Sequence, residues 1–241
     1  MNTLNQNERM VNSVIEFTDN YKFLEDFSGF NLLPSFKRQV YTIAFLNGLN
    51  LEKDLKKLTE ELEYLIGEEI SFINLFKLKV LNIIYGLIND LKNINKIDML
   101  IVLHHKKQVD YIKSLNLEDN LSVKFGIRRF NERRRLGLKR NEVVYLTSKP
   151  LRGITNNKII FNLHNFCTSL KEVCKLYKPK IVLTIEGDAP YQTLLPTAVS
   201  SLETNSICLQ WGTNSSPDAK IQVSDLLFDK IFTWSDFFNQ V

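Results

Sequence analysis

The sequence predicts an α/β fold in which a parallel sheet is covered by helices on both faces and is preceded by a region of helices. Two observations support this prediction. Short, continuous runs of apolar and β-branched residues, typical of strands buried on both faces, alternate with helical periodicity in the second half of the chain. The stretch 178–212 reads as a complete strand, helix, strand unit with polar residues at both strand ends. We expect the other elements to be organised around that unit.

Residues 1–95 have the periodicity of helices and form the first expected region. Val11 to Phe27 predicts a helix, and Pro34 separates it from a second helix at Phe36 to Leu46. Two more helices with apolar stripes are expected, at 51–65 and 75–91. We interpret this region as helices packed against the rest of the protein. A contact surface for a protein partner or for a membrane is the alternative, because amphipathic helices serve those purposes too.

From residue 96 to residue 241 strands and helices alternate. Strands are expected at 99–103, 121–125, 143–147, 181–185, 206–209 and 230–233. Helices are expected at 104–115, at 157–178 and, with a kink at Pro196, at 190–202. This order predicts a Rossmann-like three-layer domain with a parallel sheet.

Composition limits the kind of protein. With 241 residues, of which 44% are apolar, the chain can build a sizeable core. The net charge of +4 is too small to indicate nucleic-acid binding, and we expect no nucleic acid as a partner. The N-terminus lacks the pattern of a signal peptide, and no stretch has about 18 consecutive apolar residues. We therefore expect a cytoplasmic protein, with the inner face of the membrane as a second location.

Cysteine, histidine and glycine patterns exclude several classes of site. Cys167, Cys174 and Cys208 have no CxxC spacing and are expected to be reduced core residues. No cluster of His and Cys has zinc-ligand spacing, so no metal is expected. The GxGxxG, GxxxxGK[ST] and GxSxG motifs are absent, which argues against dinucleotide enzymes, P-loop NTPases and α/β-hydrolases.

The first group of candidate site residues, Glu186, Gly187 and Asp188, directly follows the strand expected at 181–185. The carboxyl ends of parallel strands face one crevice, so a carboxylate here is a candidate base or a ligand for sugar hydroxyls. Glycine between the two acids lets a ligand approach the backbone. Capping of the following helix is the alternative role for the acids.

A second polar strand end follows the strand at 206–209. Its residues, which we expect to bind substrate, are Gln210, Trp211, Gly212, Thr213 and Asn214. An indole beside glycine is a suitable platform for the apolar face of a sugar, although a core position explains it equally well. The flanking amide and hydroxyl groups can hydrogen-bond a neutral ligand.

Two histidines, His104 and His105, close the first strand at the same expected rim. Imidazole titrates near neutral pH, so either histidine is a candidate general base. Helix capping and full solvation are equally common roles. His164 falls inside the long helix and is expected to be structural.

The strongest charge run lies between two strands and contains Arg128, Arg129, Arg133, Arg134, Arg135, Lys139 and Arg140. Most such runs are solvated surfaces. If the segment folds over the crevice, its guanidinium groups can bind phosphate, and we expect Arg128, Arg129 and Arg133 to do so.

Three segments, KPKIVLTIEGD, SICLQWGT and FDKIFTWSDFF, together resemble the second half of the N-terminal domain of GT-B glycosyltransferases. The likeness is greatest to the bacterial enzymes that make capsule and surface polysaccharide, and it covers residues 97–238. In that family one strand ends in an acidic loop, and Glu186 and Asp188 match this loop. The next strand ends in a Gln-His-Gly-like motif. Residues 210–212 match this motif, with Trp211 in place of the histidine.

The resemblance implies a transferase in which this half binds a glycan acceptor and a second domain, expected beyond this chain, binds the nucleotide-sugar donor. The donor is a co-substrate, and no cofactor is expected. In such an enzyme Asp188, His104 or His105 would deprotonate or orient the acceptor hydroxyl. Two alternatives stay open, namely an enzyme similar to nucleotide-sugar epimerases and a noncatalytic module that docks a partner through its N-terminal helices.

Overall fold

The computed structural model describes residues 3–47, 55–91, 96–117, 120–147, 155–186, 190–209 and 227–232, and it confirms the predicted α/β class. The N-terminal elements are α1 (Thr3–Thr18), η1 (Asp19–Asp26), α2 (Leu33–Leu46), α3 (Leu55–Ile66) and α4 (Phe72–Leu91). The elements that follow are β1 (Met99–Ile101), α5 (Lys106–Ser114), β2 (Val123–Ile127), α6 (Phe130–Arg135), η3 (Arg140–Glu142), β3 (Val143–Tyr145), α7 (Lys158–Tyr177), β4 (Ile181–Ile185), α8 (Leu195–Val199), β5 (Asn205–Leu209) and β6 (Lys230–Phe232).

The six described strands form one parallel sheet in the order β3-β2-β1-β4-β5-β6. The chain builds one half of the sheet outward from β1 to β3. It then returns through α7 to place β4 on the other side of β1. The strand order therefore reverses between β1 and β4, and in open parallel sheets this position is where ligands bind.

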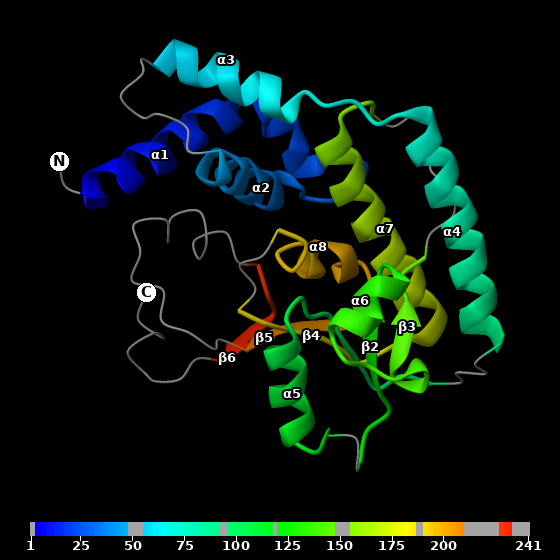
Figure 1. Cartoon of the computed structure of the whole chain (residues 1–241). Coiled ribbons are helices and arrows are strands. Elements are labelled where there is room, and N and C mark those ends of the chain that lie inside the picture. The colour runs from blue at the N-terminus through cyan, green and yellow to red at the C-terminus, as the bar shows by residue number, and fades with distance from the viewer. Residues whose placement is uncertain are drawn as a thin grey trace.

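Side chains of the strands alternate between two buried layers. On one face, Leu100, Val144 and Val182 join a core that also contains residues of α1, α2, α7 and α8. On the other face, Ile101 and Tyr145 join a second core with residues of α5 and α4. Figure 1 shows α1, α2 and α3 gathered at one end of the molecule, with α4 beside α7. The first core is continuous between the N-terminal helices and the sheet, which makes the two regions one packed unit.

The long crossover helix α7 starts and stops where its local sequence predicts. The Asn157 side chain caps it by accepting from the backbone N–H groups of Ile159 and Ile160 at 3.0 and 3.1 Å. At the other end Lys178 adopts a left-handed conformation with φ of 48°, and Pro179 follows. The expected helix at 157–178 is thus confirmed nearly to the residue.

Some element boundaries differ from the expectations because two prolines start helices and His105 caps one. Pro34 lies in the first turn of α2, and Pro196 lies in the first turn of α8, where the missing N–H of proline costs nothing. Pro34 is therefore part of its helix, and Pro196 starts a helix where a kink was expected. The expected helix at 190–202 is reduced to the short α8. Helix α5 begins at Lys106, so His104 and His105 precede it and lie on the strand-to-helix turn. The segment with the arginines contains a short helix, α6, that was not expected.

The edge strand β3 is covered by a side chain of α4. The amide of Asn89 donates to the Tyr145 carbonyl at 2.8 Å and accepts from the Tyr145 N–H at 3.0 Å, so it pairs with the strand as a neighbouring backbone would. Asn89 is buried, and the Tyr85 ring stacks on the Tyr145 ring with centroids 4.5 Å apart. These contacts attach α4 to the sheet.

Among the described residues no helix is both long and apolar enough to cross a membrane. Within the same residues no group of three or more His, Cys, Asp or Glu side chains could hold a metal ion.

Candidate functional site

The carboxyl ends of β1, β4 and β5 lie side by side, as the expected common rim requires. Strand β4 pairs in parallel with both β1 and β5. Past the paired residues, the Glu186 N–H donates to the Leu209 carbonyl at 2.7 Å. His104 and His105 follow β1, and Glu186 follows β4, so three of the predicted site residues are at the switch point.

Gln108, a fully buried residue of α5, joins the two strand ends. Its Oε1 accepts from the backbone N–H groups of His104 and His105, each at 3.3 Å. Its Nε2 donates to Glu186 Oε2 at 3.3 Å. One amide side chain therefore fixes the backbone after β1 and orients the carboxylate after β4. We call His104, His105, Gln108, Glu186 and Gln192 the switch-point cluster.

His104 is uncharged at neutral pH. Burial, with smaller contributions from the nearby His105 and Arg135, lowers the pKa of His104 to about 4, while a hydrogen bond with the Gln192 side chain opposes the shift. The His104 and His105 rings have centroids 4.1 Å apart. A neutral imidazole can donate from one ring nitrogen and accept at the other, so His104 is suited to bind a hydroxyl group.

Two buried polar atoms of the cluster have no hydrogen-bond partner among the described residues. They are His104 Nδ1, after β1, and Gln192 Oε1, in the turn that precedes α8. Gln192 is held in place by a 3.4 Å bond from its Nε2 to the Val102 carbonyl. Buried polar atoms in folded proteins are nearly always satisfied, so each exception calls for an explanation such as a bound ligand or water. The His104 and Gln192 side chains interact with each other, as the effect of Gln192 on the His104 pKa shows, and a hydroxyl group between them could accept from Nδ1–H and donate to Oε1.

The backbone of Glu186 is strained. Its φ is 69°, in the left-handed region that non-glycine residues rarely adopt. Residues held in such conformations cost about 1–3 kcal/mol and cluster at functional sites. Two bonds help to hold Glu186 in this conformation: Gln108 donates to its carboxylate, and its own backbone N–H donates to the Leu209 carbonyl.

The arginine segment reaches the same edge of the sheet. Arg128 directly follows β2, and its guanidinium carbon lies 3.9 Å from the centroid of the Tyr191 ring, in the turn after β4. Glu132 fixes Arg128 by accepting from its backbone N–H at 2.7 Å and pairing with its guanidinium at 3.2 Å. Arg129 is exposed beside it.

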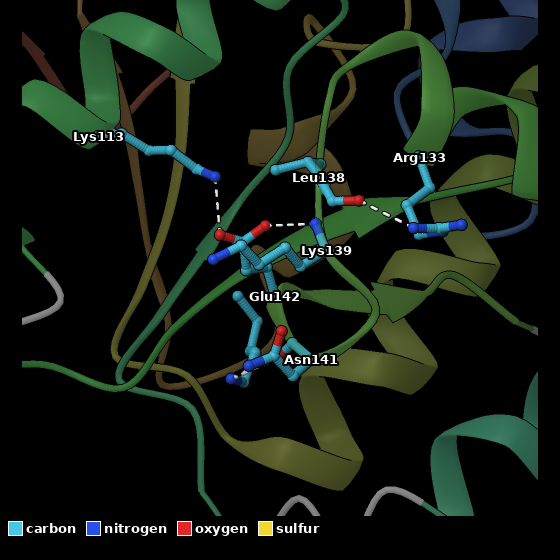
Figure 2. Close-up of polar contacts among 7 residues, drawn as sticks. Lys113, Arg133, Leu138, Lys139, Asn141 and Glu142 are labelled. Atoms are coloured by element: carbon cyan, nitrogen blue, oxygen red, sulfur yellow. Dashed lines mark hydrogen bonds and ion pairs between the residues drawn. The ribbon is translucent and has the colours of Figure 1, made fainter.

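Arg133, the third residue expected to bind phosphate, is engaged in structure. Its guanidinium donates to the Leu138 carbonyl at 3.0 Å, within the loop drawn in Figure 2. In the same loop Glu142 accepts from Lys113 Nζ at 2.7 Å and from the Lys139 N–H. Burial alone would raise the pKa of Glu142, but these two partners hold it below its ordinary value. These bonds assign Arg133 a part in fixing the α6–β3 connection, and the contacts described here do not bring it to the switch-point cluster.

The remaining predicted residues lie outside the described part of the chain. These are Gly187, Asp188, Gln210, Trp211, Gly212, Thr213 and Asn214. Their roles stay predictions, anchored by the strand ends that precede them.

Sequence reasoning missed Gln108, Gln192 and Tyr191. Gln108 had a usable signal, because Gln three residues after a helix cap is typical of a capping box, and its Oε1 indeed accepts from the cap backbone. Nothing in the local sequence indicates that Gln192 lies against β1 or that Tyr191 lies under Arg128. The contact of Tyr191 with Arg128 and that of Gln192 with Val102 form only when the turns after β1, β2 and β4 are brought together by the fold.

His164, expected to be structural, is buried between the rings of Phe27 and Phe30, with centroids 5.7 and 5.5 Å away. Burial lowers its pKa. It packs the N-terminal region onto α7.

The sequence matches no protein-family model and no curated protein sequence. The functional argument therefore rests on the site itself. The switch-point cluster combines a neutral imidazole, two amides and a carboxylate, a set that can bind a hydroxyl group and accept its proton.

Proposed function

We propose that this chain is the acceptor-side domain of a GT-B glycosyltransferase that transfers a sugar from a nucleotide sugar to a bacterial surface-glycan acceptor. The observation that carries the proposal is the pair of unpartnered buried atoms, His104 Nδ1 and Gln192 Oε1, at the switch point of the sheet. A sugar hydroxyl has the donor and the acceptor that would complete them. The sequence resemblance to that family supports the same assignment.

In this mechanism His104 and Gln192 orient the attacking hydroxyl of the acceptor. A histidine with a pKa of about 4 is a poor proton acceptor at neutral pH, so we assign that role to the Glu186 carboxylate, which Gln108 holds in place. As the hydroxyl oxygen bonds to the anomeric carbon, its proton passes to Glu186 and the bond to the nucleotide phosphate breaks. Asp188 and His105 are further candidates for the same proton. Trp211 is the expected platform for the sugar ring.

Titration of nucleotide sugars and glycan acceptors against the protein tests the proposal. We expect saturable acceptor binding that falls by tenfold or more in His104→Gln and in Trp211→Ala, since each removes direct contacts. Where transfer is measured in the presence of the donor-binding domain, Glu186→Gln and Asp188→Ala should reduce the rate more than the affinity. Glu203→Gln, at an exposed carboxylate on the opposite edge of the sheet, is the matched control. Binding that is unchanged in His104→Gln and Trp211→Ala would refute the proposal.

A second candidate function, assembly of the protein with a second copy, is favoured by the outer face of α4. Six large apolar side chains on it are between 39% and 63% exposed, namely Ile73, Phe76, Val80, Ile83, Ile84 and Leu87. Five of them, at 73, 76, 80, 83 and 87, follow the alternating spacing of three and four that forms a coiled-coil seam.

We propose a second copy as the occupant of this face because an antiparallel pair of α4 helices is complementary to itself. A register that places Val80 of one copy against Ile83 of the other also brings Phe76 against Leu87, so residues of the seam meet one another on both sides of the two-fold axis. Light scattering across a dilution series should show a dimer that Ile83→Glu converts to a monomer. Leu176→Glu, at an exposed leucine of α7, is the control. A wild-type protein that stays monomeric at every concentration would exclude this function.

A further inference from the structure

A cavity lies at the carboxyl edge of the sheet, where Tyr191 at its wall directly precedes Gln192 of the switch-point cluster. It has a volume of about 80 Å³ and is bounded by α4, α7 and the turns that follow β2, β3 and β4. Its polar lining consists of Arg128, Arg129, Asn82, Asn162, Asn165 and Ser169. The described lining contains two arginines and no Asp or Glu, and the Glu132 carboxylate that pairs with Arg128 offsets one of the two positive charges.

The positions of these polar groups are set by the fold. Arg128 is clamped by Glu132 and stacked on Tyr191, whose ring also contacts Phe166 with centroids 5.3 Å apart. Asn162, Asn165 and Ser169 succeed one another at spacings of three and four along α7, which places them on one face of that helix. The Arg128 guanidinium, held in this way, loses little conformational entropy when it binds an anion.

Size and charge define the ligand. A cavity of about 80 Å³ has room for a small group such as a phosphate, since on the same measure a single water needs about 10–15 Å³. The two arginines, the Asn162 amide and the Ser169 hydroxyl can together donate several hydrogen bonds to one small acceptor. A tetrahedral oxyanion uses such a set fully, because each of its oxygens accepts more than one bond.

We propose that this cavity, formed by α4, α7 and the turn after β2, is a phosphate-binding subsite. If the chain is an acceptor-binding domain as proposed above, the subsite selects acceptors that carry a phosphate group next to the reacting sugar. The Tyr191 and Phe166 rings at its wall hold the Arg128 guanidinium in position toward the cavity. The subsite itself depends only on the cavity and its lining.

Calorimetric titration with inorganic phosphate and with a hexose 6-phosphate tests the inference. Both should bind saturably, the sugar phosphate more tightly, and affinity should fall about tenfold or more in Arg128→Gln and in Arg129→Gln. Arg134→Gln removes the same charge from an exposed position of α6 outside the cavity and should leave affinity nearly unchanged. Asn162→Leu should weaken binding with no change in charge, which separates a formed site from general attraction. Thermal melting of each variant identifies any change caused by unfolding.

Three results would overturn the inference. They are an absence of saturable phosphate binding, equal losses in Arg134→Gln and Arg128→Gln, and binding of a hexuronate without binding of phosphate. Phosphate binding with no response to any glycan acceptor would support the subsite while removing the transferase proposal. Acceptor binding that requires His104 but does not depend on a phosphate group in the acceptor would support the transferase proposal and remove the subsite.

Discussion

Gln108 shows how much of the site depends on a single buried side chain. Its amide contacts the backbone after β1 and the carboxylate after β4, so neither strand end can shift without breaking a bond to it. Two other residues of the cluster are held at some cost. Glu186 has a left-handed backbone, and His104 is kept neutral by burial. Strain and desolvation at the same place are typical of sites that are completed by a ligand.

The lowered pKa of His104 predicts a pH dependence of stability. As the pH falls below the ordinary histidine pKa of 6.5, His104 of the unfolded chain becomes protonated. In the folded protein His104 becomes protonated only near pH 4. The free energy of unfolding should therefore decrease between these two pH values. Urea unfolding at several pH values should show a smaller decrease in His104→Gln than in wild type.

His105→Gln serves as the control for this experiment, because His105 is exposed beside His104 and its replacement should leave most of the decrease in place. The buried His164, whose pKa is also lowered, contributes a decrease of the same sign in all three proteins. An identical pH profile for wild type and His104→Gln would show that His104 is not held neutral by the fold.

At the scale of elements, α4 and α7 form the framework of the carboxyl edge. Helix α7 is predicted well by its sequence because its cap, its periodicity and its terminating proline are all local signals. Helix α4 was expected too, but its apolar residues surround it, and the sequence does not say which of them face the sheet. Asn89 determines which side of α4 faces the sheet. A polar side chain can be buried only where it has hydrogen-bond partners, and Asn89 has them in the backbone of Tyr145 on β3.

Replacement of Asn89 by alanine should destabilise the protein by about 2–4 kcal/mol. The change leaves the N–H and the carbonyl of Tyr145 without their partners in a buried environment. Urea unfolding measures the loss, and hydrogen exchange should show faster exchange of the Tyr145 amide. Asn74→Ala, at an exposed amide of the same helix, should change stability by less than about 0.5 kcal/mol. Equal effects of the two replacements would contradict the role assigned to Asn89.

At the scale of the whole molecule, one core connects the N-terminal helices to the sheet. Residues of α1 and α2 belong to the same buried cluster as residues of β1, β4 and α7. The hydroxyl of Ser35 in α2 also donates to the Pro190 carbonyl, in the turn after β4. The helices therefore support the turn that carries Tyr191 and Gln192, and the region predicted as 1–95 is coupled to the site.

Replacement of the fully buried Phe36 by alanine should lower stability by about 3–5 kcal/mol. Because α2 shares its core with the sheet, we expect helices and strands to unfold in one transition at a lower temperature. Circular dichroism during heating and hydrogen exchange in β4 would measure this. Phe45→Ala, at an exposed position of the same helix, is the control. A sheet that kept its protection while the helices unfolded would show that the two regions are independent.

The sequence by itself determined the α/β class, the parallel strands, the course of α7 and the placement of His104, His105 and Glu186 at strand ends. These features depend on hydrophobic periodicity and on capping residues, which act over a few positions of the chain. Only the tertiary structure decided that Gln108 and Gln192 join those strand ends, that Arg128 lies on Tyr191, and that Asn89 fixes α4 to β3. Such contacts join residues far apart in the chain, and they form because buried polar groups must find partners wherever packing places them.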